Sequence, residues 1–66
     1  MEDFITRLQE EKAQLDDRLG KLSGSIDGGK ILTIDTVQQS LLRIQAEAMR
    51  TYSECLYQRL QQLSDN

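Results

Sequence analysis

Residues 37–63, VQQSLLRIQAEAMRTYSECLYQRLQQL, form the stretch that decides the fold. Their apolar side chains recur at steps of three and four, which is the spacing of one side of an α-helix. Two neighbouring apolar lines result: one is Val37, Leu41, Ile44, Ala48 and Cys55, and the other is Leu42, Met49, Tyr52, Leu56 and Leu63. Together the lines are wider than a two-stranded seam requires. We therefore expect this helix to pack against two neighbours, an earlier helix of the same chain and a second copy.

The segment before this helix carries a regular seven-residue repeat. Its seam positions, at alternating steps of three and four, are Ile5, Leu8, Lys12, Leu15, Leu19, Leu22 and Ile26. Gly28 and Gly29 end this first helix, because glycine adopts the left-handed conformation after a helix at little cost. The sequence thus predicts helices over about residues 3–27 and 35–63, joined by a loop over residues 28–34.

Local signals at the helix ends support these bounds. Asp3 is the expected N-cap of the first helix and either Thr33 or Asp35 that of the second, because their side-chain oxygens accept hydrogen bonds from free backbone N–H groups. Ile31 and Leu32 belong to the loop, and we expect both to cover the closed end of the hairpin.

Two helices joined by so short a loop fold back antiparallel. We predict an all-α fold, a single domain over residues 1–66, in which a coiled-coil-like two-helix hairpin assembles into a homo-oligomeric helical bundle. The oligomer is expected because, below roughly 70–80 residues, one core rarely supplies more than about 3–5 kcal/mol. Aligning the first apolar line with the first helix places Leu19 beside Ile44 and Lys12 beside Tyr52.

Composition argues against several classes of function. The chain has no histidine and one cysteine, so we expect no metal, no cofactor and no catalytic nucleophile–base pair. Its net charge of −3 disfavours binding to duplex nucleic acid. No apolar run approaches the about 20 residues of a membrane span, and we expect no signal peptide and a cytoplasmic location. The lone Cys55 is expected to be a small buried residue.

Cations and aromatic rings gather toward the predicted open end of the hairpin. The candidate ligand-binding residues are Arg7, Lys12, Gln45, Tyr52, Tyr57 and Arg59. A nucleotide needs positive charge for its phosphate and a flat ring for its base. Simpler interpretations also remain open: Lys12 can extend its ammonium to water, Tyr52 can belong to the core, and Arg59 can pair with an acid of the first helix.

Three motifs run through nearly the whole chain. FITRL covers residues 4–8, EKAQLDDRLGKL residues 11–22 and LLRIQAEAMRTYSECLYQRL residues 41–60, with residues 45–59 the most specific part. They resemble the motifs of a family of very small phage-encoded proteins, found in tailed phages that include crAss-like ones. Members often carry an aromatic residue where this chain has Ser25.

That family is similar in size and hairpin architecture to the phage anti-CBASS and anti-Thoeris proteins known as sponges. The similarity implies a homo-oligomer that binds a cyclic nucleotide alarm signal between protomers, without cleaving it, in the cytoplasm of the infected bacterial cell. A sponge of this kind needs no catalytic group, which agrees with the composition.

Two other functions remain open at the level of the sequence. One is an acidic inhibitor or adaptor that binds a host protein. Its binding face would consist of Glu10, Glu11, Asp16 and Asp17. The other is a structural helical oligomer without a ligand, in which only seam residues such as Leu19 matter.

Overall fold

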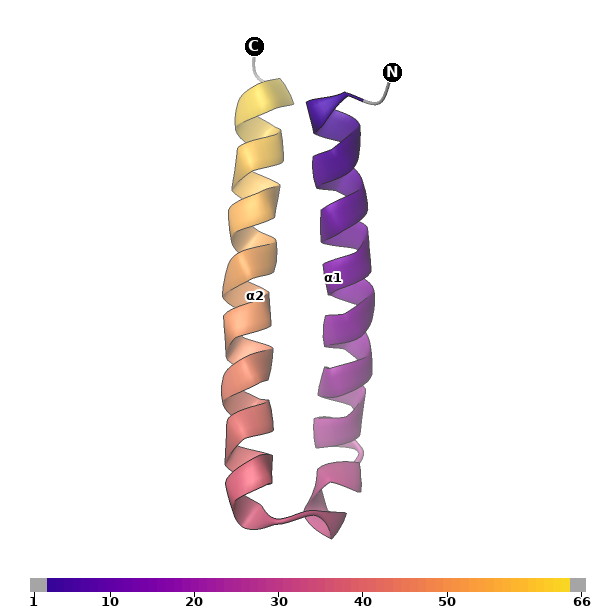
Figure 1. Cartoon of the computed structure of the whole chain (residues 1–66), viewed down its shortest axis with the longest axis vertical. Helices are drawn as coiled ribbons and strands as arrows, with labels where there is room; N and C mark the ends of the chain where they lie inside the picture. Colours follow the sequence, from indigo (N-terminus) through magenta and orange to yellow (C-terminus); the bar gives the residue numbers. More distant parts are fainter. Residues whose placement is uncertain (1–2, 65–66) are drawn as a thin grey trace.

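Two long antiparallel helices make up the protein in the computed structural model, which describes residues 3–64 (Figure 1). The elements are α1 (Phe4–Asp27), the short 3-10 helix η1 (Lys30–Thr33) and α2 (Thr36–Ser64). No strand occurs between residues 3 and 64, so the predicted all-α hairpin is confirmed. Residues 1, 2, 65 and 66 of the predicted domain lie outside the described residues. Neither α1 nor α2 is both long enough and apolar enough to cross a membrane.

Aspartate side chains cap both long helices. The Asp3 carboxylate accepts a hydrogen bond from the Thr6 N–H at 2.7 Å, and this contact lowers the pKa of Asp3. Asp35 plays the same part for α2, since its carboxylate accepts from the Val37 N–H at 3.0 Å. The cap of α2 is therefore Asp35 and not Thr33, whose hydroxyl donates to a carbonyl of η1 instead.

Glycine shapes the closed end of the hairpin. The Gly28 N–H still donates to the Gly24 carbonyl at 2.8 Å, so α1 continues past Gly24. Gly29 then has a φ of 81°, in the left-handed region that glycine adopts without strain. The chain turns there into η1, where Ile31 is buried and covers the end of the seam, whereas Leu32 is 68% exposed. The prediction that both residues cover this end is right only for Ile31.

The core is one seam between α1 and α2. On α1 it contains the predicted residues except Ile5, which is 40% exposed, and Leu8 and Leu15 are buried. On α2 the buried and half-buried positions are Gln39, Leu42, Ala46, Met49, Ser53, Leu56, Leu60 and Leu63. These alternate at steps of three and four, as in a coiled-coil seam. Ala46 and Leu56, at 1% and 0% exposed, are its most buried members.

The predicted pairing of the two helices is wrong. Ile44 is 64% exposed, and Ser53 lies at the seam, where its hydroxyl donates to Asp16 at 2.5 Å. Because Ser53 contacts Asp16, counting one turn forward along α1 and one turn back along α2 places Met49, not Ile44, beside Leu19. Ala46 and Ser53 belong to neither predicted apolar line, yet they continue the seam, which keeps its leucines up to the open end.

The first apolar line of α2 consequently faces away from α1. We call it the outer stripe, and it consists of Val37, Leu41, Ile44, Ala48 and Cys55, all exposed. The prediction that Cys55 is buried is wrong for the single hairpin, because its side chain is exposed. Of the two apolar lines on α2, the second thus contributes to the seam with α1, and the first remains exposed as the outer stripe.

Replacing Leu56 by alanine is expected to lower the free energy of unfolding by about 2–5 kcal/mol, because the variant loses apolar burial and leaves a cavity. Urea denaturation followed by circular dichroism, at one protein concentration, measures this change. Leu32→Ala is the control, since Leu32 is 68% exposed; it should alter stability by less than about 0.5 kcal/mol. Equal losses in the two variants would contradict the seam described here.

Candidate functional site: an exposed aromatic side of the hairpin

The two long edges of the seam carry different chemistry. Gln45, Tyr52 and Arg59 are seven residues apart, so they lie in one row along α2, about 90° around the helix from the centre of the seam. The Arg59 guanidinium lies over the Phe4 ring of α1, 5.6 Å from its centroid. We call this edge the aromatic side, made of Phe4, Gln45, Tyr52 and Arg59.

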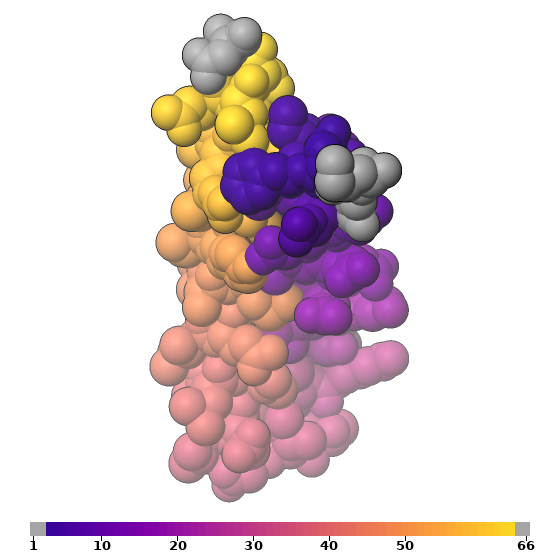
Figure 2. Space-filling model, turned by 45° about the horizontal axis from the view of Figure 1, so that its top comes forward, coloured from indigo at the N-terminus to yellow at the C-terminus, as the bar shows by residue number. Residues whose placement is uncertain are grey.

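The contact between Arg59 and Phe4 joins the two helices at the open end. Figure 2 shows the start of α1, in indigo, lying against the end of α2, in yellow. Phe4 is 56% exposed and Arg59 is also exposed, so the contact contributes about 0.5–1 kcal/mol. None of the ion pairs within residues 3–64 involves Arg59. Its guanidinium thus keeps N–H donors directed toward solvent, where an anion can reach them.

Tyr52 and Gln45 continue the aromatic side toward the closed end. Tyr52 is 45% exposed, so the interpretation of Tyr52 as a core residue does not hold in the hairpin. The Gln45 amide is exposed, and its nitrogen lies 4.0 Å from the Met49 sulfur, a weak contact. Both side chains therefore present a polar group and, in Tyr52, a ring face to the solvent.

Lys12 belongs to the opposite edge of the seam. Its ammonium donates to one oxygen of Asp16 at 2.6 Å, and the Ser53 hydroxyl of α2 donates to the other oxygen at 2.5 Å. The hydrogen bond from Lys12, followed by that from Ser53, lowers the pKa of Asp16. Lys12 thus serves an interhelical polar contact in the hairpin, which satisfies its charge at a seam position.

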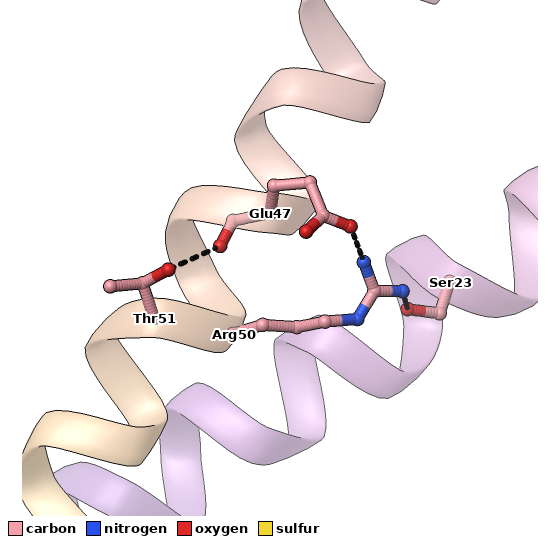
Figure 3. A network of polar contacts seen from close by, with 4 residues as sticks. All are labelled: Ser23, Glu47, Arg50 and Thr51. Atoms are coloured by element: carbon pink, nitrogen blue, oxygen red, sulfur yellow. Dashed lines mark hydrogen bonds and ion pairs between the residues drawn. The ribbon is translucent and has the colours of Figure 1, made fainter.

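A second interhelical polar contact lies on the same edge as Asp16. Arg50 of α2 reaches across to the Ser23 hydroxyl of α1, with a nitrogen–oxygen distance of 3.2 Å, and pairs with Glu47 of its own helix (Figure 3). We call this edge the network side, made of Lys12, Asp16, Ser23, Arg50 and Ser53. The charged side chains of the network side form ion pairs within the chain, whereas Arg59 on the aromatic side contacts the Phe4 ring.

The structure separates the six residues that the sequence groups together. Gln45, Tyr52 and Arg59 share the aromatic side, and Arg7 joins them, since it is exposed and lies one turn beyond Phe4 on α1. Lys12 lies on the network side. Tyr57 is about 140° around α2 from Tyr52 and points toward that side as well. Within one hairpin the six candidate residues thus lie on two different edges.

Phe4 is the member of the aromatic side that the sequence analysis misses. It precedes the first seam residue and opens the FITRL motif, but that motif assigns it no role in ligand binding. Only the register brings it beneath Arg59. Within residues 3–64 the hairpin encloses no pocket, and it has no cluster of histidine, cysteine or acidic residues able to hold a metal ion.

Fold and surface together define a small helical-hairpin protein with one edge stabilised by polar contacts and the other bearing exposed rings and cations. The chain belongs to the Sequestin family, whose profile matches residues 2–62. It is also 39% identical over 59 residues to a protein of Enterobacteria phage T4, described as an uncharacterized 7.5 kDa protein in the denB-rIIB intergenic region. That alignment covers 89% of this chain and 92% of the phage protein. No solved structure matches the chain.

The phage T4 relative supports the expectation of a family of small phage proteins. The predicted links to crAss-like phages and to the nucleotide sponges stay predictions. The matched range, residues 2–62, spans the whole aromatic side.

Protonation of Asp16 is expected to weaken the hairpin. Because its pKa is lowered in the fold, Asp16 stabilises the protein above its ordinary value of 3.8, and this stabilisation is lost as the pH falls through the folded-state pKa. Lys12→Met removes the largest cause, so the pKa of Asp16 should rise toward 3.8. Carboxyl-carbon NMR measures it, with Asp3 as internal control, since its partner Thr6 is unchanged. An unchanged Asp16 pKa in this variant would contradict the described contact.

Proposed function

We propose that this protein binds and sequesters a cyclic nucleotide signal, without cleaving it, at sites between the protomers of a homo-oligomer. One observation carries the proposal. The row of Gln45, Tyr52 and Arg59 lies directly beside the uncovered outer stripe of α2, so a second copy packed on that stripe would stand next to the row. The match to the Sequestin family supports the sequestering part of this proposal, and the phage T4 relative supports a small phage protein.

The chemistry of the row suits a nucleotide. Arg59 offers a planar fork of N–H donors that binds phosphate oxygens in pairs, and Tyr52 offers a ring face for a base. The two residues are seven positions apart, about 10 Å along α2. A ligand that touches both must therefore be larger than a single phosphate, as a dinucleotide or a cyclic ADP-ribose-type molecule is. Arg7 supplies a second cation near Arg59 at the open end.

A site between copies gives the ligand the burial that the single hairpin lacks. Ligand sites commonly bury 70–90% of a small molecule. On one hairpin, Tyr52 and Arg59 border a convex edge that leaves a ligand open to water on its far side. A second copy closes that side, removes water from the phosphate contacts and strengthens them.

The proposed mechanism has no chemical step. Charge, stacking and hydrogen bonding hold the nucleotide, and the protein lowers its free concentration in proportion to the number of sites. The site proposed here consists of Arg7, Gln45, Tyr52 and Arg59 beside Phe4. Lys12 and Tyr57 take no part in it, because they lie toward the network side.

Native mass spectrometry and calorimetry with a panel of cyclic di- and trinucleotides and cyclic ADP-ribose isomers test this function. Whole ligands should bind in a fixed ratio to protomers and be recovered unaltered. Tyr52→Ala and Arg59→Ala should each weaken binding at least about tenfold, because a stacked base or a paired phosphate is worth about 1–3 kcal/mol.

Tyr57→Ala is the matched control for Tyr52→Ala. Both tyrosines are 45% exposed on the same helix, so they lose equal surface, yet only Tyr52 lies on the aromatic side. Tyr57→Ala should bind like the unmodified protein. Absence of binding across the panel, cleavage of a ligand, or equal losses in the two variants would overturn the proposal.

A further inference from the structure

The outer stripe of α2 has the repeat of a helix-packing seam. Thr51 fits between Ala48 and Cys55, so positions 37, 41, 44, 48, 51 and 55 alternate at steps of four and three over about 27 Å. Val37, Leu41 and Ile44 are 62%, 51% and 64% exposed in the hairpin. Such a repeat matches another helix that carries the same repeat.

Polar groups along the stripe already have partners inside the chain. The Thr51 hydroxyl donates to the Glu47 carbonyl at 3.1 Å, and the Glu47 carboxylate is held by Arg50, both visible in Figure 3. Thr51 can therefore be covered without leaving a hydrogen-bonding group unsatisfied, and its methyl group faces outward with the neighbouring apolar side chains.

We propose that the outer stripe packs against the same stripe of a second copy, with the two α2 helices parallel and in register. This arrangement specifies the protomer contact that the proposed function needs, and it rests on that function only for its biological purpose. Each α2 then has α1 of its own chain on one side and α2 of the second copy on nearly the opposite side.

Charge complementarity along the stripe selects a second copy in this orientation. In parallel helix pairs, a residue flanking one edge of the seam meets the residue five positions later on the partner. Glu54 and Arg59 flank opposite edges of the outer stripe with that separation. Glu54 contacts Gln58 at 2.9 Å and Arg59 contacts a ring, so neither has an ion-pair partner within residues 3–64. In a parallel pair, Glu54 of each copy can form an ion pair with Arg59 of the other copy, so the twofold symmetry gives two such ion pairs.

The antiparallel alternative sets like charges against each other. It brings each edge of the stripe against the same edge of the second copy, so that the edge carrying Glu47 and Glu54 faces the same acidic edge and Arg59 faces an edge without a carboxylate. The parallel pair instead stacks Ala48 on Ala48 and Cys55 on Cys55, small residues that let the helices approach. Arg59 has five N–H donors, enough to pair with a carboxylate and still bind a phosphate.

Cross-linking between identical positions distinguishes the two orientations. In a parallel in-register pair every stripe residue faces its own copy, whereas an antiparallel pair permits this only near the twofold axis. Diamide should join two Cys55 thiols, taking two electrons and two protons and leaving a disulfide-linked dimer. Ile44→Cys in a Cys55→Ser background should form the same dimer from a position eleven residues away. Cys55→Ser alone should form none.

The matched control places the cysteine on the other helix. Ala13→Cys in the Cys55→Ser background exposes a thiol on α1, away from the stripe. Both stripe thiols should cross-link at least about tenfold faster than this control at micromolar protein, because association raises their effective concentration. Linkage at only one of positions 44 and 55, or at a rate equal to the control, would overturn the parallel pair.

Charge exchange tests the ion pairs directly. Glu54→Arg and Arg59→Glu should each weaken self-association by about tenfold or more, as like charges then meet, and the double variant should restore it. Sedimentation equilibrium without nucleotide measures the dissociation constant, and circular dichroism checks that each variant remains helical. Failure of the double variant to recover association would contradict the proposed register.

Ile44→Glu should abolish association, whereas Leu32→Glu, at a residue of similar exposure outside α2, should not. A protein that stays monomeric at about 100 μM, where weak specific interfaces already form, would overturn the interface. These measurements omit the nucleotide, so the two proposals fail separately. Association as described without any ligand in the panel leaves the interface and removes the function. Nucleotide bound by an oligomer whose cross-links exclude the parallel register removes the interface and leaves the function.

Discussion

A hairpin of two helices has only one seam, and this constraint governs the rest of the structure. α2 carries two apolar lines, and α1 can cover only one of them. The covered line keeps Leu56, Leu60 and Leu63 at the open end, where Leu8 of α1 needs partners. The uncovered line reaches Thr51 and Cys55 instead, so pairing it with α1 would leave the open end poorly packed. The choice of seam thus follows from the distribution of leucine.

The same choice determines what each edge of the hairpin can do. The Ser53 hydroxyl of α2 donates to Asp16 at 2.5 Å and Arg50 of α2 donates to Ser23 at 3.2 Å, so directional bonds on the network side cross between the helices and hold their register. Because the register is fixed there, the aromatic side needs no polar contacts between the helices. Tyr52 and Arg59 are free to face solvent and, in the proposed function, a nucleotide.

Much of the fold could be predicted from the sequence, but the pairing of the helices could not. Heptad spacing identified the seam of α1, and Asp3 and Gly29 marked the ends of α1 correctly. The seam of α2 was missed because Ala46 and Ser53 are weakly apolar or polar, while the more apolar Ile44 lies outside it. With the wrong line facing α1, Lys12 was grouped with Tyr52. Choosing the wrong apolar line of α2 therefore leaves the predicted hairpin unchanged but alters which side chains are predicted to share an edge.

The seam also shows why folding and binding should be coupled in this protein. Lys12 and Ser53 occupy positions where leucine would bury more apolar surface, and they contribute polar contacts of modest net strength instead. A chain of 66 residues with so narrow a core buries little surface on folding, so its free energy of unfolding is expected to be small. A second copy or a ligand that binds only the folded hairpin adds its binding free energy to that stability. In the proposed dimer and its nucleotide complex, the outer stripe and the aromatic side are therefore the surfaces whose burial adds to the stability of the fold.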